Sequence, residues 1–321
     1  MKVAVIGVGV IGNVHLEILL DQGITPVSIC DVDESKTAKF PMLKAYTDYK
    51  EMLDTEKPDI VHICTPHYLH AEMAVYALER NINVLCEKPL CMSREEIDAV
   101  LAAEEKSSAQ LAVCFQNRYI PRNRFVKEYL ADKKVVKAQA SLFWERGESY
   151  YNSAEWRGTK KYEGGGVLIN QAIHTVDLLN LFCGGFEEIT ANCSNLSLQG
   201  VIEVEDTAAL CLYNDSAVCT FVATNASKVS LPIQMSLITE EGTLLELVGD
   251  DLIIDGEKKD FKNEVFYGKA CYGMGHAPLI ADFYDCVATG RKFPIDGKEG
   301  AKALRIVLSA YESDGKRIKI K

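Results

Sequence analysis

The stretch KVAVIGVGVIGNVH, residues 2–15, decides the expected fold. It reads as a buried apolar strand that runs into a glycine turn and then into a segment of helical period. Where GxGxxG closes a strand and opens a helix, the first glycine permits the tight turn, the second lets the backbone approach a pyrophosphate, and the third lets helix and strand pack closely. The stretch is therefore predicted to bind a dinucleotide through Gly7, Val8, Gly9, Val10, Ile11 and Gly12.

Asp31 ends the next apolar run, PVSICD, 19 residues beyond Gly12. A carboxylate at this place accepts hydrogen bonds from the ribose hydroxyls of the adenosine. Asp33 and Glu34 follow with no arginine beside them, so a 2′-phosphate would meet three acidic residues. The cofactor is therefore predicted to be NAD, and NADP is disfavoured.

The first part of the chain alternates apolar runs with helical patterns, which predicts βαβ units and a parallel sheet covered on both faces. After about residue 120, alternating strands with turn signals predict an antiparallel sheet of five or six strands. Helical patterns return at 276–289 and 298–312, and the chain ends on a short strand, RIKIK. The prediction is an α/β protein with a Rossmann domain at 1–120 and an α+β domain with a large, mostly antiparallel open sheet at 121–321. The C-terminal helix of the second domain is expected to pack back on the first domain.

Composition excludes several classes of partner. A net charge of −11 opposes phosphate backbones, and no basic stripe interleaves with aromatics, so nucleic acid is not expected. No apolar run approaches bilayer length and no signal peptide is visible. The 11 cysteines are odd in number and form no CxxC pair, which indicates reduced thiols in the cytoplasm. The histidines form no zinc motif, and His67 with His70 lacks a third ligand, so no metal is expected.

Two further stretches carry chemistry. LCEKPLC, residues 85–91, follows the fourth apolar run, so Lys88 should point toward the nicotinamide, since ligands bind outside the carboxyl ends of such strands. GGGVLINQAIHTVD, residues 164–177, places Asn170 and His174 four residues apart, on one face of an α-helix. Taken alone, His174 is better interpreted as a core histidine bonded to a neighbouring amide.

The combination changes that interpretation. The glycine turn, TPHYLHAEMAVYAL at 65–78, EKP at 87–89 and GGGVLINQAIHTVDLL at 164–179 occur in this order. Together they resemble the glucose–fructose oxidoreductase, inositol dehydrogenase and MocA-like (Gfo/Idh/MocA) family over nearly the whole chain. The resemblance implies NAD(P)-dependent oxidoreduction at a secondary alcohol or ketone of a sugar, cyclitol or sugar derivative. It also implies that the second domain binds substrate and forms oligomer contacts, and that Lys88 and His174 are catalytic, near the substrate hydroxyl. The peptide that corresponds to Lys88–Pro89 is often cis in members of this family.

The remaining site residues are expectations of the same resemblance and of position in the sheet. Asn170 departs from the best-known relatives, which have aspartate there; an amide can still orient a substrate hydroxyl or the His174 ring. Trp156 and Arg157 could stack on and grip a sugar, could instead indicate an anionic sugar or a nucleotide-sugar phosphate, or could form a packed aromatic loop. We expect cofactor contacts from Thr65, Pro66, Glu87, Lys88 and Gln116, and substrate contacts from Tyr119, Trp156, Arg157, Asn170 and His174.

Two other functional classes stay open. One is a redox-neutral glycoside-processing enzyme that oxidises and re-reduces its substrate with tightly held NAD. The other is a non-catalytic NAD or sugar sensor on the same fold, since fold does not fix function. A large sheet with few helices to cover it also predicts a homo-oligomer, a dimer or tetramer.

Overall fold

The computed structural model describes residues 1–262, 265–268 and 273–321. The chain divides into two compact units, one comprising Met1–Tyr119 with Glu264–Ala301 and the other Ile120–Asn263 with Lys302–Lys321. The sequence predicts a domain boundary at residue 120, and the chain first passes from one unit to the other at this point. Residues 264–301, which the sequence assigns to the second domain, group with the first unit.

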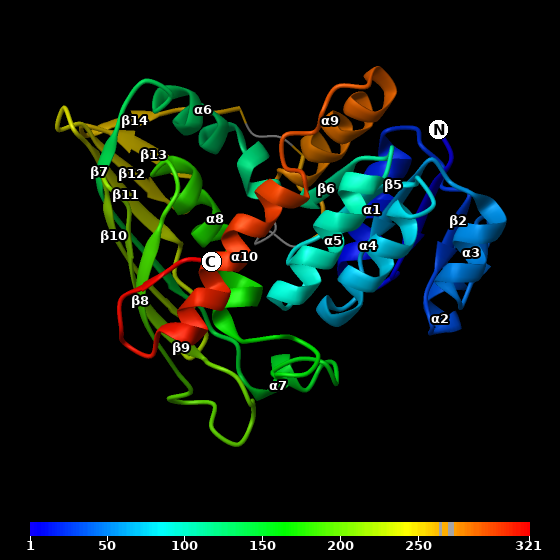
Figure 1. Ribbon diagram of the computed structural model, residues 1–321, viewed down its shortest axis with the longest axis horizontal. Coiled ribbons are helices and arrows are strands. Elements are labelled where there is room, and N and C mark those ends of the chain that lie inside the picture. The colour runs from blue at the N-terminus through cyan, green and yellow to red at the C-terminus, as the bar shows by residue number, and fades with distance from the viewer. Residues whose placement is uncertain (263–264, 269–272) are drawn as a thin grey trace. The chain divides into compact units, whose positions relative to one another are not determined.

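The first unit is built on a parallel sheet of six strands in the order β3-β2-β1-β4-β5-β6, which confirms the predicted Rossmann architecture (Figure 1). The strand order reverses between β1 and β4, the switch point beside which ligands bind in such sheets. Strand β3 was not anticipated, because its residues are largely exposed and form no apolar run. The strands are β1 Val3–Ile6, β2 Ser28–Cys30, β3 Lys44–Tyr46, β4 Ile60–Ile63, β5 Asn83–Glu87 and β6 Leu111–Cys114.

Helices alternate with the strands of this unit, as the sequence predicts. Helix α9, His276–Thr289, has the bounds that the sequence predicts, and it contacts α1 and β6. Helix α5, Arg94–Lys106, begins at a capping box in which Ser93 and Glu96 bond to each other's backbone amides. The other helical segments are α1 Val10–Asp21, α2 Glu34–Thr37, α3 Tyr49–Glu56, α4 His70–Leu78 and the 3₁₀ turns η1 His67–Leu69 and η2 Gln116–Tyr119.

The second unit is built on a mixed sheet of nine strands in the order β14-β13-β12-β11-β7-β10-β9-β8-β15. The predicted number of five or six strands is wrong: β11–β12 and β13–β14 are hairpins that each contribute two strands, and the terminal strand joins the edge of the sheet. All pairings are antiparallel except β7 with β10. The strands are β7 Val135–Phe143, β8 Glu188–Ser194, β9 Thr207–Tyr213, β10 Val218–Thr224, β11 Gln234–Thr239, β12 Leu244–Val248, β13 Asp251–Ile254, β14 Glu257–Lys259 and β15 Ile318–Lys319.

Helices cover one face of this sheet. Along β10, Cys219, Phe221 and Ala223 are buried and alternate with exposed residues, as expected of a strand with one covered face. Figure 1 shows α6 and α8 along that side, and α8 contacts β7. The helices are α6 Pro121–Tyr129, α7 Glu148–Tyr151, α8 Ile173–Phe182 and α10 Gly297–Ser313, the last of which is shared between the two units. Among the described residues, no helix combines the length and the apolar character needed to cross a bilayer.

Candidate active site residues

The glycine turn in the first unit has the geometry that a dinucleotide requires. Gly7 has a φ of 87°, and a Cβ atom there would lie 2.6 Å from the carbonyl oxygen of Cys64. A Cβ atom at Gly12 would lie 1.9 Å from the carbonyl oxygen of Gly7. At Gly9, the N-cap of α1, a Cβ atom would meet nothing within 4 Å. The first and third glycines are therefore required by the protein itself, whereas the second leaves room for a ligand at the helix N-terminus.

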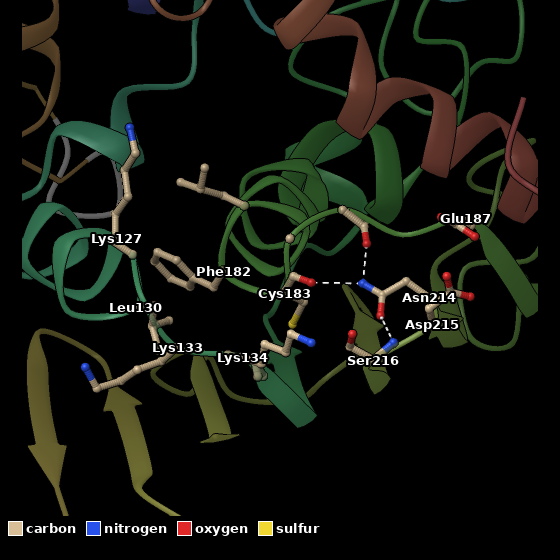
Figure 2. A pocket seen from close by; sticks show the side chains of 15 residues that line it. Lys127, Leu130, Lys133, Lys134, Phe182, Cys183, Glu187, Asn214, Asp215 and Ser216 are labelled. Carbon is tan, nitrogen blue, oxygen red and sulfur yellow. Dashed lines mark hydrogen bonds between the residues drawn. The ribbon is translucent and has the colours of Figure 1, made fainter. Parts of the chain in front are cut away.

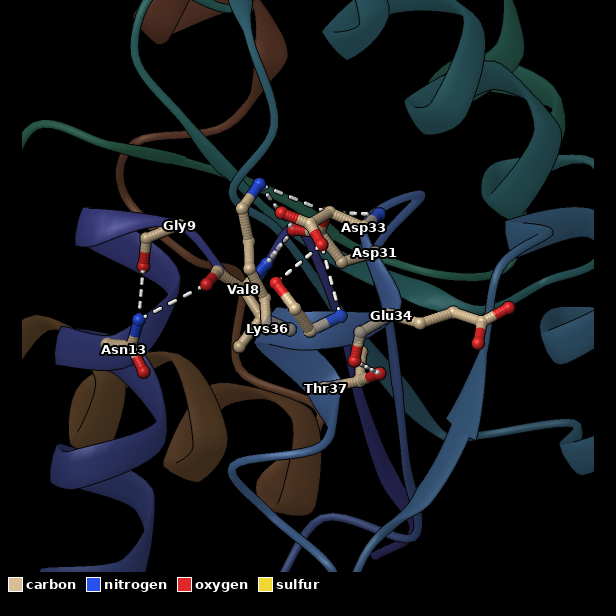
Figure 3. Close-up of polar contacts among 9 residues, drawn as sticks. Val8, Gly9, Asn13, Asp31, Asp33, Glu34, Lys36 and Thr37 are labelled. Carbon is tan, nitrogen blue, oxygen red and sulfur yellow. Dashed lines mark hydrogen bonds and ion pairs between the residues drawn. The ribbon is translucent and has the colours of Figure 1, made fainter. Parts of the chain in front are cut away.

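Asp31 lies directly beside this turn, at the end of β2 (Figure 3). Its Oδ2 atom accepts a hydrogen bond of 2.8 Å from the Val8 amide, and the residue is only 8% exposed. The turn and the carboxylate are thus held together by a direct bond. This is the arrangement expected of an acceptor for ribose hydroxyls, so the residues present fit NAD.

The ends of β4 and β5 carry the next predicted residues. The Lys88–Pro89 peptide is cis, as the resemblance implies, and Lys88 is half-buried. His70 Nδ1 lies 2.6 Å from the carbonyl oxygen of Pro89, and its Nε2 atom lies 2.7 Å from that of Thr65. His70 therefore ties the two turns together in a structural role. Pro66 is the N-cap of η1 and supplies no side-chain cap.

Glu87 is the centre of a buried cluster that the sequence did not reveal. Its Oε1 atom lies 3.1 Å from His15 Nε2 and 3.5 Å from His276 Nε2. Burial favours the neutral carboxyl, but the hydrogen bonds and charges of His15 and His276 outweigh it and hold the pKa of Glu87 well below its usual range. Glu87 Oε2 accepts from the Lys88 amide at 3.2 Å. The cluster thus holds the backbone amide of Lys88 in place.

The cluster extends away from Glu87 through a chain of rings. His15 Nδ1 lies 2.9 Å from His62 Nδ1, and His62 Nε2 lies 3.0 Å from the Tyr284 hydroxyl. The atoms of His15, Glu87, Cys114 and His276 that could bind a metal ion also lie within 4.8 Å of one another. No sequence motif predicts that these four residues lie together, because they come from four separate elements. The His15 Nε2–Glu87 Oε1 contact within this group is at hydrogen-bond distance.

The turn η2 holds two predicted site residues, Gln116 for the cofactor and Tyr119 for the substrate. Gln116 is 4% exposed, and a Cβ atom at Gly275 would lie 1.9 Å from its carbonyl oxygen. The Tyr119 hydroxyl bonds Asp282 at 2.5 Å, and the ring stacks on Phe293 with centroids 6.3 Å apart. These contacts hold the Tyr119 ring and hydroxyl within the first unit, and its contact with substrate stays a prediction.

In the second unit, the glycine triplet is set by close packing. A Cβ atom at Gly165 would lie 2.1 Å from the Tyr311 hydroxyl, and one at Gly166 would lie 1.8 Å from the carbonyl oxygen of Glu205. The Glu205 carboxylate accepts from the amides of Gly166 and Leu168, at 2.8 and 3.0 Å, and from Tyr311 at 3.0 Å. Burial raises the pKa of Glu205 to about 7. Glu205 therefore anchors the segment that leads to His174, a role with no signal in the sequence.

The helix that carries His174 differs from the expectation. Residues 168–172 form a π-helical turn, and α8 begins only at Ile173. The prediction that Asn170 and His174 share a face assumed α-helical spacing throughout, whereas a π turn widens the ladder to i→i+5. His174 is half-buried at the second position of α8.

Asn170 belongs to a buried polar network. Its Nδ2 atom donates a short hydrogen bond to Glu163 Oε1, and Glu163 is 1% exposed. Gln171 Nε2 donates to the Tyr150 hydroxyl at 3.0 Å, and Asn225 donates to Gln171 Oε1 at 2.8 Å. Sequence reasoning missed Glu163, although it immediately precedes the glycine triplet. The carboxylate that the segment lacks at position 170 is present next to it.

Arg157 joins the same network through Tyr150. Its Nη1 atom donates to the Tyr150 hydroxyl at 2.5 Å. The guanidinium lies 4.4 Å from the centre of the Tyr150 ring and 4.5 Å from that of Trp156. This arrangement places Arg157 against two aromatic rings, and it brings Arg157, Tyr150 and Asn170 together.

A cavity of about 550 Å³ lies elsewhere in the second unit (Figure 2). Phe182 and Cys183, at the C-terminal end of α8, line it together with Lys127 and Asn214. Asn214 Nδ2 donates to the carbonyl oxygen of Cys183 at 2.9 Å. None of the predicted site residues lines this cavity, and His174 lies at the opposite end of α8.

Comparison with known proteins identifies both parts of the chain. Residues 1–115 match the oxidoreductase family with an NAD-binding Rossmann fold, and residues 131–245 match the GFO/IDH/MocA C-terminal domain. Among curated relatives, the levoglucosan dehydrogenase of Pseudarthrobacter phenanthrenivorans is 26% identical over 48% of this chain and 40% of its own length. Inositol 2-dehydrogenase of Salmonella typhimurium is 31% identical over 56% of this chain and 54% of its own. The 2,7-anhydro-N-acetylneuraminate hydratase of Mediterraneibacter gnavus is 25% identical over 61% and 53%. The chain thus matches about half of the length of these relatives.

Solved structures match the whole chain in fold. The WlbA dehydrogenase from Bordetella pertussis, in complex with NADH and UDP-GlcNAcA, has a TM-score of 0.87 at 23% identity, covering 100% of this chain and 98% of that one. Levoglucosan dehydrogenase, in complex with NADH and levoglucosan, has a TM-score of 0.87 at 20% identity, covering 100% and 99%. With both domains matched in order, the chain belongs to the Gfo/Idh/MocA family of NAD-binding oxidoreductases.

Proposed function

We propose that this protein transfers hydride between NAD and a secondary alcohol or ketone of a sugar, cyclitol or sugar derivative. The relatives that act on levoglucosan and inositol support this class of substrate. The observation that carries the proposal is the geometry of the dinucleotide turn. There is free space around Gly9 for a ligand, whereas backbone atoms of the protein crowd Gly7 and Gly12. The chain also keeps Lys88 after β5 and His174 in α8.

The proposed mechanism assigns one role to each catalytic residue. Bound NAD would supply the hydride acceptor at nicotinamide C4. In the oxidation direction, His174 takes the proton of the substrate hydroxyl as the carbon loses hydride. Lys88 donates a hydrogen bond to the same oxygen and stabilises its developing negative charge. In reduction, His174 returns the proton.

Contacts with the rest of the substrate are proposed for the second unit. Asn170, Trp156 and Arg157 belong to one connected set of side chains, through Tyr150. Trp156 offers an aromatic face, and Arg157 offers a cation that is already aligned by Tyr150, a pairing suited to a sugar ring that carries several oxygens.

Preference for NAD over NADP, a cytoplasmic location and a homo-oligomeric state are further parts of the proposal. Asp31 beside the turn supports the preference for NAD. The described cysteines are all free, and most are buried, which supports a reducing compartment. The uncovered face of the second sheet exposes Val218, Val222 and Ile238 by 37–39%, and this supports a dimer or tetramer.

A redox-neutral reaction is the second candidate. The relative named as a hydratase shows that this family also includes an enzyme whose name denotes no net oxidation or reduction. In that case, tightly held NAD would be reduced and then reoxidised within one turnover.

The test follows reduced nicotinamide absorbance with NAD and a panel of cyclitols, aldoses, sugar acids, anhydro-sugars and nucleotide sugars. We expect Lys88→Ala and His174→Ala each to lower turnover by roughly 10² or more. Lys133→Ala, which removes a partly exposed lysine paired with Asp132, is the matched control and should leave the rate unchanged. Near-normal rates in both site variants would refute the assigned roles. Silence across the panel with NAD retained through purification would favour the redox-neutral reaction, and reversible NAD binding without turnover would favour a sensor.

A further inference from the structure

A lysine lies on the carboxylate that selects the cofactor. Lys36, in α2, places its Nζ atom 3.2 Å from Asp31 Oδ1 and 3.4 Å from Asp31 Oδ2 (Figure 3). The Asp31 side chain is 7% exposed, whereas that of Lys36 is 39% exposed. Because both carboxylate oxygens are within reach of one ammonium, the charge of Asp31 is partly compensated where a ribose would bind.

The two neighbouring acids are directed elsewhere. Asp33 caps α2, with its Oδ1 atom accepting from the Ser35 amide at 3.0 Å and from the Ser35 hydroxyl at 2.6 Å. In Figure 3 the Glu34 carboxylate points away from Asp31. Of the three acids that the sequence sets against a 2′-phosphate, only Asp31 stands beside the glycine turn, and it is paired with a cation that sequence reasoning overlooked.

We propose that Lys36 is a specificity-determining residue for the 2′ position of the adenosine ribose. Paired with Asp31, it lowers the penalty that the carboxylate imposes on a 2′-phosphate. When Asp31 is removed, Lys36 becomes the cation that binds this phosphate. The inference rests on the proposed preference for NAD over NADP, and it names the residue that determines how strong this preference is.

The geometry determines the direction of each effect. A ribose hydroxyl gains little from a nearby ammonium, whereas a phosphate gains a charge-assisted hydrogen bond. Lys36→Gln should therefore weaken NADPH binding several-fold more than NADH binding, since an exposed charge pair changes affinity by roughly two- to fivefold. In the Asp31→Ser background the ammonium has no competing partner. There, the same substitution should weaken NADPH binding by roughly tenfold or more.

The experiment measures dissociation constants for NADH and NADPH from nicotinamide fluorescence. It uses the full chain as wild type, Lys36→Gln, Asp31→Ser and the double variant. Lys39→Gln is the matched control, because it removes the same charge from an exposed position whose described contacts do not include Asp31. Lys36→Arg should keep the ratio of the two constants near that of wild type. Because Lys36 is partly exposed, its single variants test the proposal even if Asp31→Ser folds poorly.

The outcomes separate this inference from the function that it rests on. A ratio shifted by Lys36→Gln but not by Lys39→Gln, with a larger shift in the Asp31→Ser background, supports the role of Lys36. A ratio that Lys36→Gln leaves unchanged, while NADH still binds, overturns that role and leaves the proposed function standing. Failure of the wild-type protein to bind either nucleotide would overturn both.

Discussion

Replacing Asn170 by aspartate, the residue of the best-known relatives, should destabilise this protein. Asn170 Nδ2 donates directly to Glu163, which is 1% exposed. In Asn170→Asp, a second carboxylate would replace the donor and face the first one inside the second unit. The usual residue of the family is therefore incompatible with the surroundings that this chain provides.

Two routes to the magnitude agree. Like charges about 4 Å apart repel by about 4 kcal/mol at an effective dielectric constant near 20. If the pair binds a proton instead, taking it up at pH 7 costs about 1.36 kcal/mol for each unit above the ordinary aspartate pKa of about 3.9, again about 4 kcal/mol. A loss of this size is a large part of the total stability of a typical domain.

The penalty should depend on pH in a defined direction. The folded pair of Asn170→Asp keeps a proton that the unfolded chain has lost above about pH 4, so stability falls as pH rises. At pH 5 the cost of holding that proton is only about 1.5 kcal/mol. Urea unfolding of wild type and variant at pH 7 and pH 5 measures both differences.

The swapped pair is the control. In Glu163→Gln combined with Asn170→Asp, the amide at position 163 donates to the new carboxylate at position 170, and one charge remains. This double variant should regain most of the lost stability at pH 7. A single variant within about 1 kcal/mol of wild type would refute the reasoning, as would a penalty that does not shrink at pH 5. Failure of the double variant to recover would show that repulsion from Glu163 is not the cause.

Two further predictions concern the first unit. Gly9→Ala should weaken NADH binding and cost no more than about 1 kcal/mol of stability, because its Cβ atom meets nothing in the protein and only the N-cap preference is lost. Gly12→Ala should cost about 3 kcal/mol or more, because its Cβ atom would lie 1.9 Å from the Gly7 oxygen. Thermal unfolding and NADH titration separate the two variants, and equal effects would contradict the assignment. His62 is fully buried, and burial holds its pKa well below 6.5. As pH falls below about 6.5, His62 therefore binds a proton in the unfolded chain but not in the folded one, and stability is lost by about 1.4 kcal/mol per pH unit. His62→Gln should remove that part of the slope between pH 6.5 and 5.5, and an unchanged slope would show that His62 does not titrate in this way.

Much of the cofactor domain could be predicted because its signals are local. The constraint on Gly12 comes from the carbonyl oxygen of Gly7 within the same strand–turn–helix unit, whereas that on Gly7 comes from Cys64 at the end of the neighbouring strand β4. Asp31 follows from the length of one βα unit, and the parallel sheet follows from runs of apolar residues. By contrast, β3 has no apolar run, and the strands of the second sheet are undercounted although turn signals separate β11 from β12 and β13 from β14.

The candidate site shows where the sequence stops being informative. The motifs predict Lys88 and His174 as catalytic residues, but they do not reveal the groups that hold their surroundings, namely His15 and His276 around Glu87 and Glu205 beside the glycine triplet. The sequence likewise does not reveal that the hydroxyl of Tyr119, which is predicted to contact substrate, bonds Asp282.

What the sequence alone determined is what neighbouring residues enforce: backbone sterics at glycine, the period of strands and helices, and the order of the motifs. What only the tertiary structure decided is which side chains meet. Glu163 reaches Asn170 across a glycine triplet, Glu205 reaches Tyr311 from 106 positions away, and His62 reaches Tyr284 from 222. Such pairs are selected by burial, because a polar group removed from water must find a partner in whichever element the fold brings beside it.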